Sequence, residues 1–323
     1  MDLLKLFAIF LVIYGDSLQH LISTPAVQQP AYRFIYSFHM PLFMAVSGFF
    51  AASLSRLTVR EFFFRKGRQL LIPAVVASLL AALLGLAFGH GIDSDYLIYG
   101  IWFLKSLFLC MLLYYTSVRL ARRPFIALMI SLLISQVIPY FKLPQMYPAF
   151  LLGAVLHSYW PAVKRHAITL MTCSGILFAI MLLWLDASDF ESVSTTAAVR
   201  AFLHGDTTPL TTLVSVRYYR IALGLAGTLF FFLLFEIVAA HLAGKSWVPK
   251  LSQYGQRTLG VYIIQTFILE ILLHEILSFD KLNTYLFTFI IAPAISLLIL
   301  IITLWLAGLS ARNRLTSAII LGR

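Results

Sequence analysis

Residues Leu3–Ile22 read LLKLFAIFLVIYGDSLQHLI, a nearly unbroken apolar run close to the start of the sequence. Towards the other end, Ile291–Leu306 reads IAPAISLLILIITLWL. Each run approaches or reaches the roughly 20 apolar residues that a helix needs to cross the hydrocarbon core of a bilayer. The first run has no basic leader and no cleavage site of small residues, so we interpret it as a retained helix. The two runs therefore indicate membrane-spanning helices.

The composition supports the same interpretation. Hydrophobic residues make up 61% of the sequence and charged residues 11%, whereas a soluble domain carries about 25% charged residues. Cys110 and Cys173 both lie inside apolar runs, which indicates neither a disulfide framework nor a metal site. The net charge of +11 could suggest a nucleic-acid partner, but the basic residues cluster in the gaps between apolar runs. We therefore expect one membrane domain over residues 1–323, with no metal and no nucleic acid.

The apolar runs predict an all-α, polytopic integral membrane bundle of about ten transmembrane helices. Turn-forming residues such as Gly91, Asp93, Pro144 and Pro161 lie between the runs. No internal repeat or low-complexity segment is evident. The predicted spans are Leu3–Ile22, Ala31–Ser53, Gln69–Gly89, Tyr96–Val118, Pro124–Tyr140, Met146–Trp160, Ala167–Leu185, Tyr218–Leu242, Thr258–Leu277 and Thr284–Leu309.

The distribution of lysine and arginine predicts the orientation of these spans, because cytoplasmic loops carry an excess of both residues. With Lys5 included, 17 of the 24 basic residues fall on one side of the predicted bundle, six fall on the other and Lys105 falls within a span. The first side is therefore predicted to be cytoplasmic, and ten crossings place both termini there (N-in, C-in). The longest loop on the other side is predicted over Asp186–Arg217, either as a functional segment or as a solvated connection.

Ionisable residues inside the spans are the candidate functional residues, because a charge within the bilayer is costly and usually faces the bundle interior. Lys5 and Asp16 are eleven residues apart, so they share one face of a helix about 16 Å apart. His20 lies one turn beyond Asp16. His39, in the next span, could meet Asp16 as an acid–base pair. A buried pair that only fixes the packing of the two helices is an equally good interpretation.

Further candidates lie at the ends and centres of later spans. Arg65 and Arg68 could present two guanidinium groups on one helix face, suited to phosphates, although such clusters usually reflect the positive-inside rule. Lys105 is too far from either end of its span to reach water easily, so we expect it to face inward. Gln265 lies mid-span and is expected to hydrogen-bond across the bundle or to contact substrate. Glu270 could pair with His274 or reach the outer surface.

Five segments of the chain, in order, resemble the membrane-bound acyltransferase family 3, the O-acyltransferases of bacterial surface glycans. Lys5-x10-Asp16 occupies the positions at which the family has Arg or Lys followed after ten residues by His. Arg65-x-x-Arg68 matches the R-x-x-R pair at the start of the family's third helix. Three further segments also resemble the family. They are Phe38–Phe43 with Ser47–Phe49, Trp102–Leu104, and Gly255–Tyr262.

The resemblance implies a ten-helix membrane enzyme that transfers an acyl group, most simply acetyl, from acetyl-CoA or another acyl-CoA. The acceptor would be a glycan or lipid-linked saccharide outside the bacterial cytoplasmic (inner) membrane. Asp16, His39 and Lys105 are then the expected catalytic residues, and Lys5, Arg65 and Arg68 the expected coenzyme A ligands. Possible substrate contacts are His20, Trp102, Tyr262, Gln265 and Glu270.

Asp16 departs from the family, which has its catalytic histidine at this position. Asp16 could act as a weaker base, His20 or His39 could take over the role, or the chain could be an inactive member. A proton-coupled transporter is the main alternative, because intramembrane Asp, His, Lys and Glu residues also form proton relays. The lack of an inverted repeat argues against a transporter.

Overall fold

The computed structural model describes residues 1–87, 101–190, 195–242, 244–280, 282–313 and 316–317, and the described part is helical without strands. The α-helices are α1 Asp2–His20, α2 Pro30–Phe49, α3 Val59–Phe62, α4 Ile72–Ala87, α6 Trp102–Leu120, α7 Pro124–Val137, α8 Leu143–Ser158, α9 Trp160–Arg165, α10 Ala167–Leu183, α11 Thr195–Leu203, α12 Thr208–Leu242, α13 Trp247–Gly255, α14 Thr258–Thr266, α15 His274–Ile276, α16 Thr284–Leu286 and α17 Ala292–Ser310. Three π-helical segments extend neighbouring helices: η3 Phe63–Leu71, η6 Phe267–Leu273 and η7 Phe287–Ile291. The 3-10 turns are η1 Ala26–Gln28, η2 Ala51–Arg56, η4 Tyr140–Lys142 and η5 Ala187–Phe190.

Several of these helices are long and apolar enough to cross a membrane. Within the described residues, four qualify by length and composition: Asp2–His20, Val59–Leu86, Thr208–Leu242 and Thr284–Ser310. Three shorter apolar helices accompany them: Pro124–Val137, Ala167–Leu183 and Thr258–Glu270. The all-α, multi-pass class is therefore confirmed, while the count of ten spans and the N-in, C-in orientation stay predictions.

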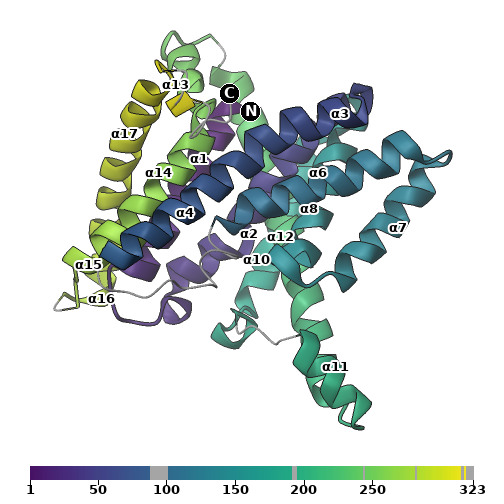
Figure 1. Cartoon of the computed structure of the whole chain (residues 1–323), viewed down its shortest axis with the longest axis horizontal. Helices are drawn as coiled ribbons and strands as arrows, with labels where there is room; N and C mark the ends of the chain where they lie inside the picture. The colour runs from purple at the N-terminus through teal and green to yellow at the C-terminus, as the bar shows by residue number, and fades with distance from the viewer. Residues whose placement is uncertain (88–100, 191–194, 243, 281, 314–315, 318–323) are drawn as a thin grey trace.

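The helix that follows the longest predicted loop begins earlier than expected. We predicted a span from Tyr218, but α12 begins at Thr208. Much of the predicted loop is ordered, because η5 and α11 both lie within it. In Figure 1, α11 projects from the lower end of the bundle, away from the other helices. The span predicted from Tyr96 to Val118 starts outside the described residues, and its described part is α6.

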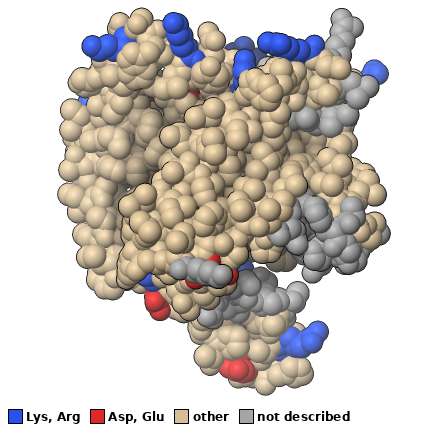
Figure 2. Space-filling view, turned by 90° about the vertical axis from the view of Figure 1, so that its left-hand side faces the viewer, with Lys and Arg blue, Asp and Glu red and all other residues tan. Residues whose placement is uncertain are grey.

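Charge is distributed unevenly along the molecule. The N-terminus and α13 lie at the upper end of the bundle in Figure 1. Most of the Lys and Arg atoms on the face shown in Figure 2 lie along that same upper edge, above a broad band without charge, and acidic atoms lie near the lower end. The uncharged band matches a surface that contacts lipid, and we call the upper edge the basic end.

Helices α2 and α8 approach each other closely because glycines remove the side chains at their crossing. A Cβ atom added at Gly153 would lie 1.8 Å from the carbonyl oxygen of Ala45, and one added at Gly48 would lie 1.9 Å from that of Phe150. Small residues allow such close backbone contact between helices in membranes. This crossing holds α2 against α8, and both helices carry residues of the site described below.

The turn at the basic end between α2 and α4 is fixed by a capping box. The hydroxyl of Thr58 accepts a hydrogen bond from the backbone N–H of Glu61, and the Glu61 carboxylate accepts one from the backbone N–H of Thr58. The cap determines where α3 and η3 begin, and therefore which residues of η3 face the bundle.

Candidate functional site

One stripe of α1 links the basic end to the interior of the bundle. Lys5, Ile9, Val12 and Asp16 recur at steps of three or four residues, so they lie on one face of the helix. The first three line a cavity, and Asp16 lies one turn further into the bundle. The shared face of Lys5 and Asp16 that we predicted is therefore present in one continuous helix.

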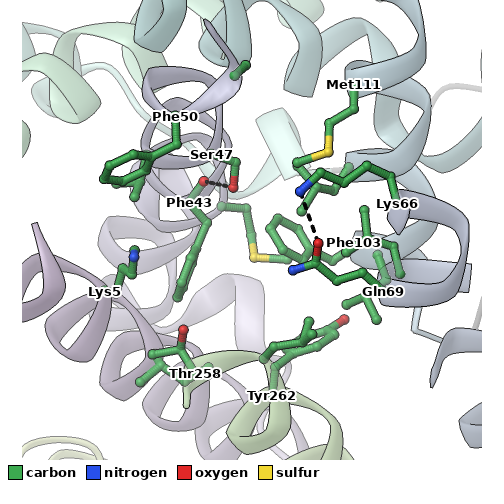
Figure 3. Close-up of a pocket in the computed structure, with 18 of the residues that line it drawn as sticks. Lys5, Phe43, Ser47, Phe50, Lys66, Gln69, Phe103, Met111, Thr258 and Tyr262 are labelled. Atoms are coloured by element: carbon green, nitrogen blue, oxygen red, sulfur yellow. Dashed lines mark hydrogen bonds between the residues drawn. The ribbon is translucent and has the colours of Figure 1, made fainter. Parts of the chain in front are cut away.

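The cavity has a volume of about 380 Å³ and is enclosed by α1, α2, η2, η3, α6, α14 and the turn between α13 and α14. Its walls are mostly apolar and include Met40, Phe43, Phe103 and Met111. Lys5 and Lys66 contribute the basic groups of the lining and face the space from opposite sides (Figure 3). The result is an apolar pocket with two ammonium groups, which suits a ligand with a long uncharged arm and an anionic head.

Each lysine of the pocket is held by a neighbouring group. The Lys5 ammonium donates a hydrogen bond of 2.9 Å to Asp2 and lies 5.0 Å from the centre of the Phe50 ring. The Lys66 ammonium donates a 3.0 Å hydrogen bond to the side-chain oxygen of Gln69 (Figure 3). Both lysines are partly exposed, so a ligand can reach them from the basic end.

Arg65 and Arg68 lie outside this pocket lining, and the contact with coenzyme A that we expected from them stays a prediction. Both are exposed, and Arg65 lies 3.7 Å from the carboxylate of Glu61. The reason is the register of η3. Lys66 and Gln69 face the cavity, so the residue before each of them points to a different side of the helix.

A buried polar centre lies beyond the inner part of the pocket. Asp16 is 9% exposed, and one of its carboxylate oxygens accepts a 2.8 Å hydrogen bond from the hydroxyl of Tyr36. The other oxygen accepts a 2.9 Å bond from the side-chain amide of Gln265, which is fully buried. Three helices, α1, α2 and α14, therefore meet at one carboxylate.

His39 belongs to the same centre but does not pair directly with Asp16 in the described residues. Tyr36 lies between them, because its hydroxyl bonds Asp16 while its ring packs edge-on against the His39 imidazole, with centroids 4.6 Å apart. The Nδ1 atom of His39 lies 2.7 Å from the carbonyl oxygen of Ile35. A carbonyl can only accept, so Nδ1 carries the proton and Nε2 is the basic nitrogen.

Gln265 leaves one polar atom unsatisfied. Its side-chain oxygen is buried and has no hydrogen-bond partner in the described part of the chain, although such atoms are nearly always paired. The amide nitrogen faces the Asp16 carboxylate, which cannot donate to the oxygen, whereas an imidazole at position 16 could donate a ring N–H to the oxygen of a turned-over amide. The surroundings of Asp16 are therefore also suited to histidine.

A second, smaller cavity of about 40 Å³ lies on the other side of this centre. Tyr36 and Met40 are in its wall, and Met40 also lines the larger pocket. Lys142 and Arg220 line it as well. The two cavities therefore approach each other at one turn of α2, beside the tyrosine that holds Asp16.

Lys142 lies in the turn between α7 and α8, outside the predicted spans. Its ammonium is 4.6 Å from the centre of the Trp102 ring, a cation–π contact. Desolvation by the surrounding protein, with a smaller effect of Arg220, lowers the pKa of Lys142 to about 8. Its side chain is therefore mainly charged at pH 7.

Of the remaining predicted residues, some line one of the two cavities and others lie outside both. Tyr262 lines the larger pocket and Trp102 the smaller one. Lys105 lines neither cavity and lies 3.5 Å from the hydroxyl of Ser78 on α4. At the end of α1, His20 contacts His274, whose Nδ1 is 2.9 Å from the His20 carbonyl oxygen.

Glu270, the last of the predicted residues, is partly buried in η6, beyond Gln265. Other elements of the site could not be identified from the sequence. Tyr36, Lys66, Lys142 and Arg220 were not singled out as site residues. Tyr36 is one of 15 tyrosines, and only the three-residue step to His39 could have drawn attention to it. No group of three or more His, Cys, Asp or Glu side chains suited to a metal occurs among the described residues.

The fold and the site together define the class of this protein. The chain is an all-helical, multi-pass membrane protein with a basic-ended pocket that leads to a buried polar centre. Its sequence matches the family model described as an acyltransferase domain, that of acyltransferase family 3, over residues 1–311. The protein therefore belongs to acyltransferase family 3. No curated protein and no solved structure matches the chain.

Proposed function

We propose that this protein transfers an acyl group, most simply acetyl, from acyl-coenzyme A to a hydroxyl of a glycan or lipid-linked saccharide across the bacterial cytoplasmic membrane. The observation that carries the proposal is the pocket at the basic end. It has ammonium groups at Lys5 and Lys66, mostly apolar walls, and a stripe of α1 that leads from Lys5 to Asp16. Membership of an acyltransferase family supports the same chemistry.

The donor would enter from the basic end, which is cytoplasmic under the positive-inside rule. Its phosphates would contact Lys5 and Lys66, with Arg65 and Arg68 at the exposed rim. The uncharged pantetheine arm would then lie against Phe43, Phe103 and the other apolar walls. This arrangement would bring the thioester towards the level of Met40, close to the polar centre.

The acceptor hydroxyl would approach from the smaller cavity, beside Tyr36. A base at the polar centre, at Asp16 in this chain or at His39, would take the hydroxyl proton while the oxygen attacks the thioester carbonyl carbon. The carbon–sulfur bond would then break, the proton would pass to the leaving thiolate, and coenzyme A would depart as the thiol. Under this proposal each substrate would have its own cavity, and one group between the two cavities would move the proton.

Coenzyme A binding tests the donor pocket. We expect Lys66→Gln and Lys5→Gln each to weaken coenzyme A binding by roughly tenfold or more, because each removes a charge-assisted contact to phosphate. Arg68→Gln should weaken it less, since Arg68 is exposed outside the pocket lining. Calorimetric titration of the purified protein measures these affinities.

Arg122→Gln is the matched control, because it removes an exposed positive charge that does not line the pocket. The coenzyme A affinity of this variant should equal that of the unmodified protein. Equal coenzyme A affinities for the unmodified protein and all four variants would show that the donor does not bind in this pocket. Proton-dependent solute flux in liposomes, without any coenzyme A binding, would favour a transporter instead.

A further inference from the structure

The smaller cavity contains two positive charges next to the polar centre. Lys142 reaches it from the turn before α8, and Arg220 reaches it from α12. Neither side chain makes a hydrogen bond or an ion pair in the described part of the chain. Their close contacts are with aromatic rings: Lys142 with Trp102 at 4.6 Å, and Arg220 with Phe190 at 4.4 Å.

Two unpaired cations in one small cavity repel each other, so their side chains need an anion nearby. Asp16 attracts Lys142, and Asp189 attracts Arg220, but both carboxylates are too distant for an ion pair. The hydrogen-bond donors of the two cations are therefore available to an external oxyanion. Gln145 also lines the cavity and adds an amide. At about 40 Å³ the space holds roughly three water molecules, enough for a small oxyanion.

The backbone around this cavity is held in a strained conformation. Phe141 and Lys142 both have φ of 54°, and Ile101, which precedes Trp102, has φ of 53°. These are the positive-φ residues other than glycine in the described chain, and side chains other than glycine rarely adopt the left-handed region. Strain of this kind often accompanies ligand sites. Here it presents the Lys142 side chain to the cavity and against Trp102.

We infer that Lys142 and Arg220 form a subsite for an oxyanion carried by the acceptor, either a sugar carboxylate or the phosphate of a lipid-linked saccharide. The inference rests on the proposed acyl transfer and specifies its acceptor as an acidic saccharide. An anion between these two cations would lie beside Tyr36, so a neighbouring hydroxyl of the same saccharide could reach the polar centre. A neutral glycan would leave both cations without a partner and would bind more weakly.

Tryptophan fluorescence gives a test that does not need turnover, because Trp102 contacts Lys142. The purified full chain is titrated with trigalacturonate, which carries sugar carboxylates, with glucose 1-phosphate, which carries a phosphate, and with maltotriose, which is neutral. Trp102→Phe identifies the part of the signal that comes from Trp102. The variants are Lys142→Gln, Arg220→Gln, the conservative Lys142→Arg, and Arg200→Gln as a control for the loss of an exposed charge on α11. Coenzyme A affinity is measured in parallel on every variant.

We expect an acidic probe to change the Trp102 signal, and maltotriose to leave it unchanged. Lys142→Gln and Arg220→Gln should each weaken binding of the acidic probe roughly tenfold or more, while Lys142→Arg and Arg200→Gln keep most of it. A stronger response to trigalacturonate identifies a sugar carboxylate, and a stronger response to glucose 1-phosphate identifies a lipid-linked phosphate.

Equal responses to maltotriose and the acidic probes would overturn the inference. So would unchanged affinity in both glutamine variants. Coenzyme A affinity separates this inference from the proposed function. Normal coenzyme A binding without anion binding rejects the subsite alone, whereas anion binding without coenzyme A binding supports the subsite and rejects the acyl donor.

Discussion

Asp16→His is expected to raise the rate of acyl transfer at least tenfold, and up to about 10²–10⁴-fold if the carboxylate contributes no base catalysis. An imidazole has an ordinary pKa near 6.5, much closer to the working pH than that of a carboxylate. The Gln265 amide already contacts position 16, and its buried oxygen has no hydrogen-bond partner in the described part of the chain, so a turned-over amide would accept a ring N–H from the new histidine. Release of the coenzyme A thiol from acetyl-CoA by the purified protein measures the effect.

Asp16→Asn is the control for this experiment. It keeps the size of the side chain and an oxygen that can accept from Tyr36, but it cannot take a proton. We expect it to be inactive while coenzyme A still binds. If Asp16→His is no faster than the original sequence and His39→Ala abolishes turnover, the base is His39, whose Nε2 is the basic nitrogen. If every variant binds coenzyme A and none turns over, the chain is an inactive member of its family.

The second large effect is expected at the crossing of α2 and α8. Gly153→Ala should lower the thermal stability of the detergent-solubilised protein by several degrees or prevent folding. The added methyl group would lie 1.8 Å from the Ala45 carbonyl oxygen, and backbone atoms cannot move aside without separating the helices. The melting transition, followed by fluorescence or by size-exclusion chromatography after heating, measures this change.

Gly85→Ala provides the matched comparison, since nothing lies within 4 Å of the added Cβ atom. Alanine is favoured over glycine in a helix by roughly 1 kcal/mol, so Gly85→Ala should keep or raise the melting temperature. Equal melting temperatures for the two variants would show that α2 and α8 are not in close contact. Because α2 carries Tyr36 and His39, Gly153→Ala should also reduce activity in any protein that remains folded.

The fold class could be predicted from the sequence, and so could the face of α1 that carries Lys5 and Asp16. Long apolar runs predict helices whatever their neighbours, and the steps from Lys5 to Asp16 place both on one face of α1. The start of α12 at Thr208 was missed because its first turns are rich in threonine. Such residues are compatible with either a loop or a helix end, and only the packing of the helix decides between them.

Contacts between helices could not be predicted, because they depend on how each helix is rotated about its axis. Arg65 and Arg68 are correctly spaced for one face, yet the register of η3 turns Lys66 and Gln69 into the pocket. Gln265 hydrogen-bonds across the bundle as expected, but its partner could not be identified, because Asp16 is 249 residues away in the sequence. The roles of Tyr36 and Lys142 depend on their contacts with Asp16 and Trp102, which belong to other helices.

The most direct test of the account follows a labelled acetyl group from acetyl-CoA. The purified protein carrying Asp16→His is incubated in nanodiscs with labelled acetyl-CoA and trigalacturonate, and label on the saccharide is counted against released thiol. We expect label to appear on the saccharide in step with thiol release, and Lys66→Gln in the same background to slow both at low donor concentration. Absence of label and thiol release, together with no detectable coenzyme A binding, would contradict it.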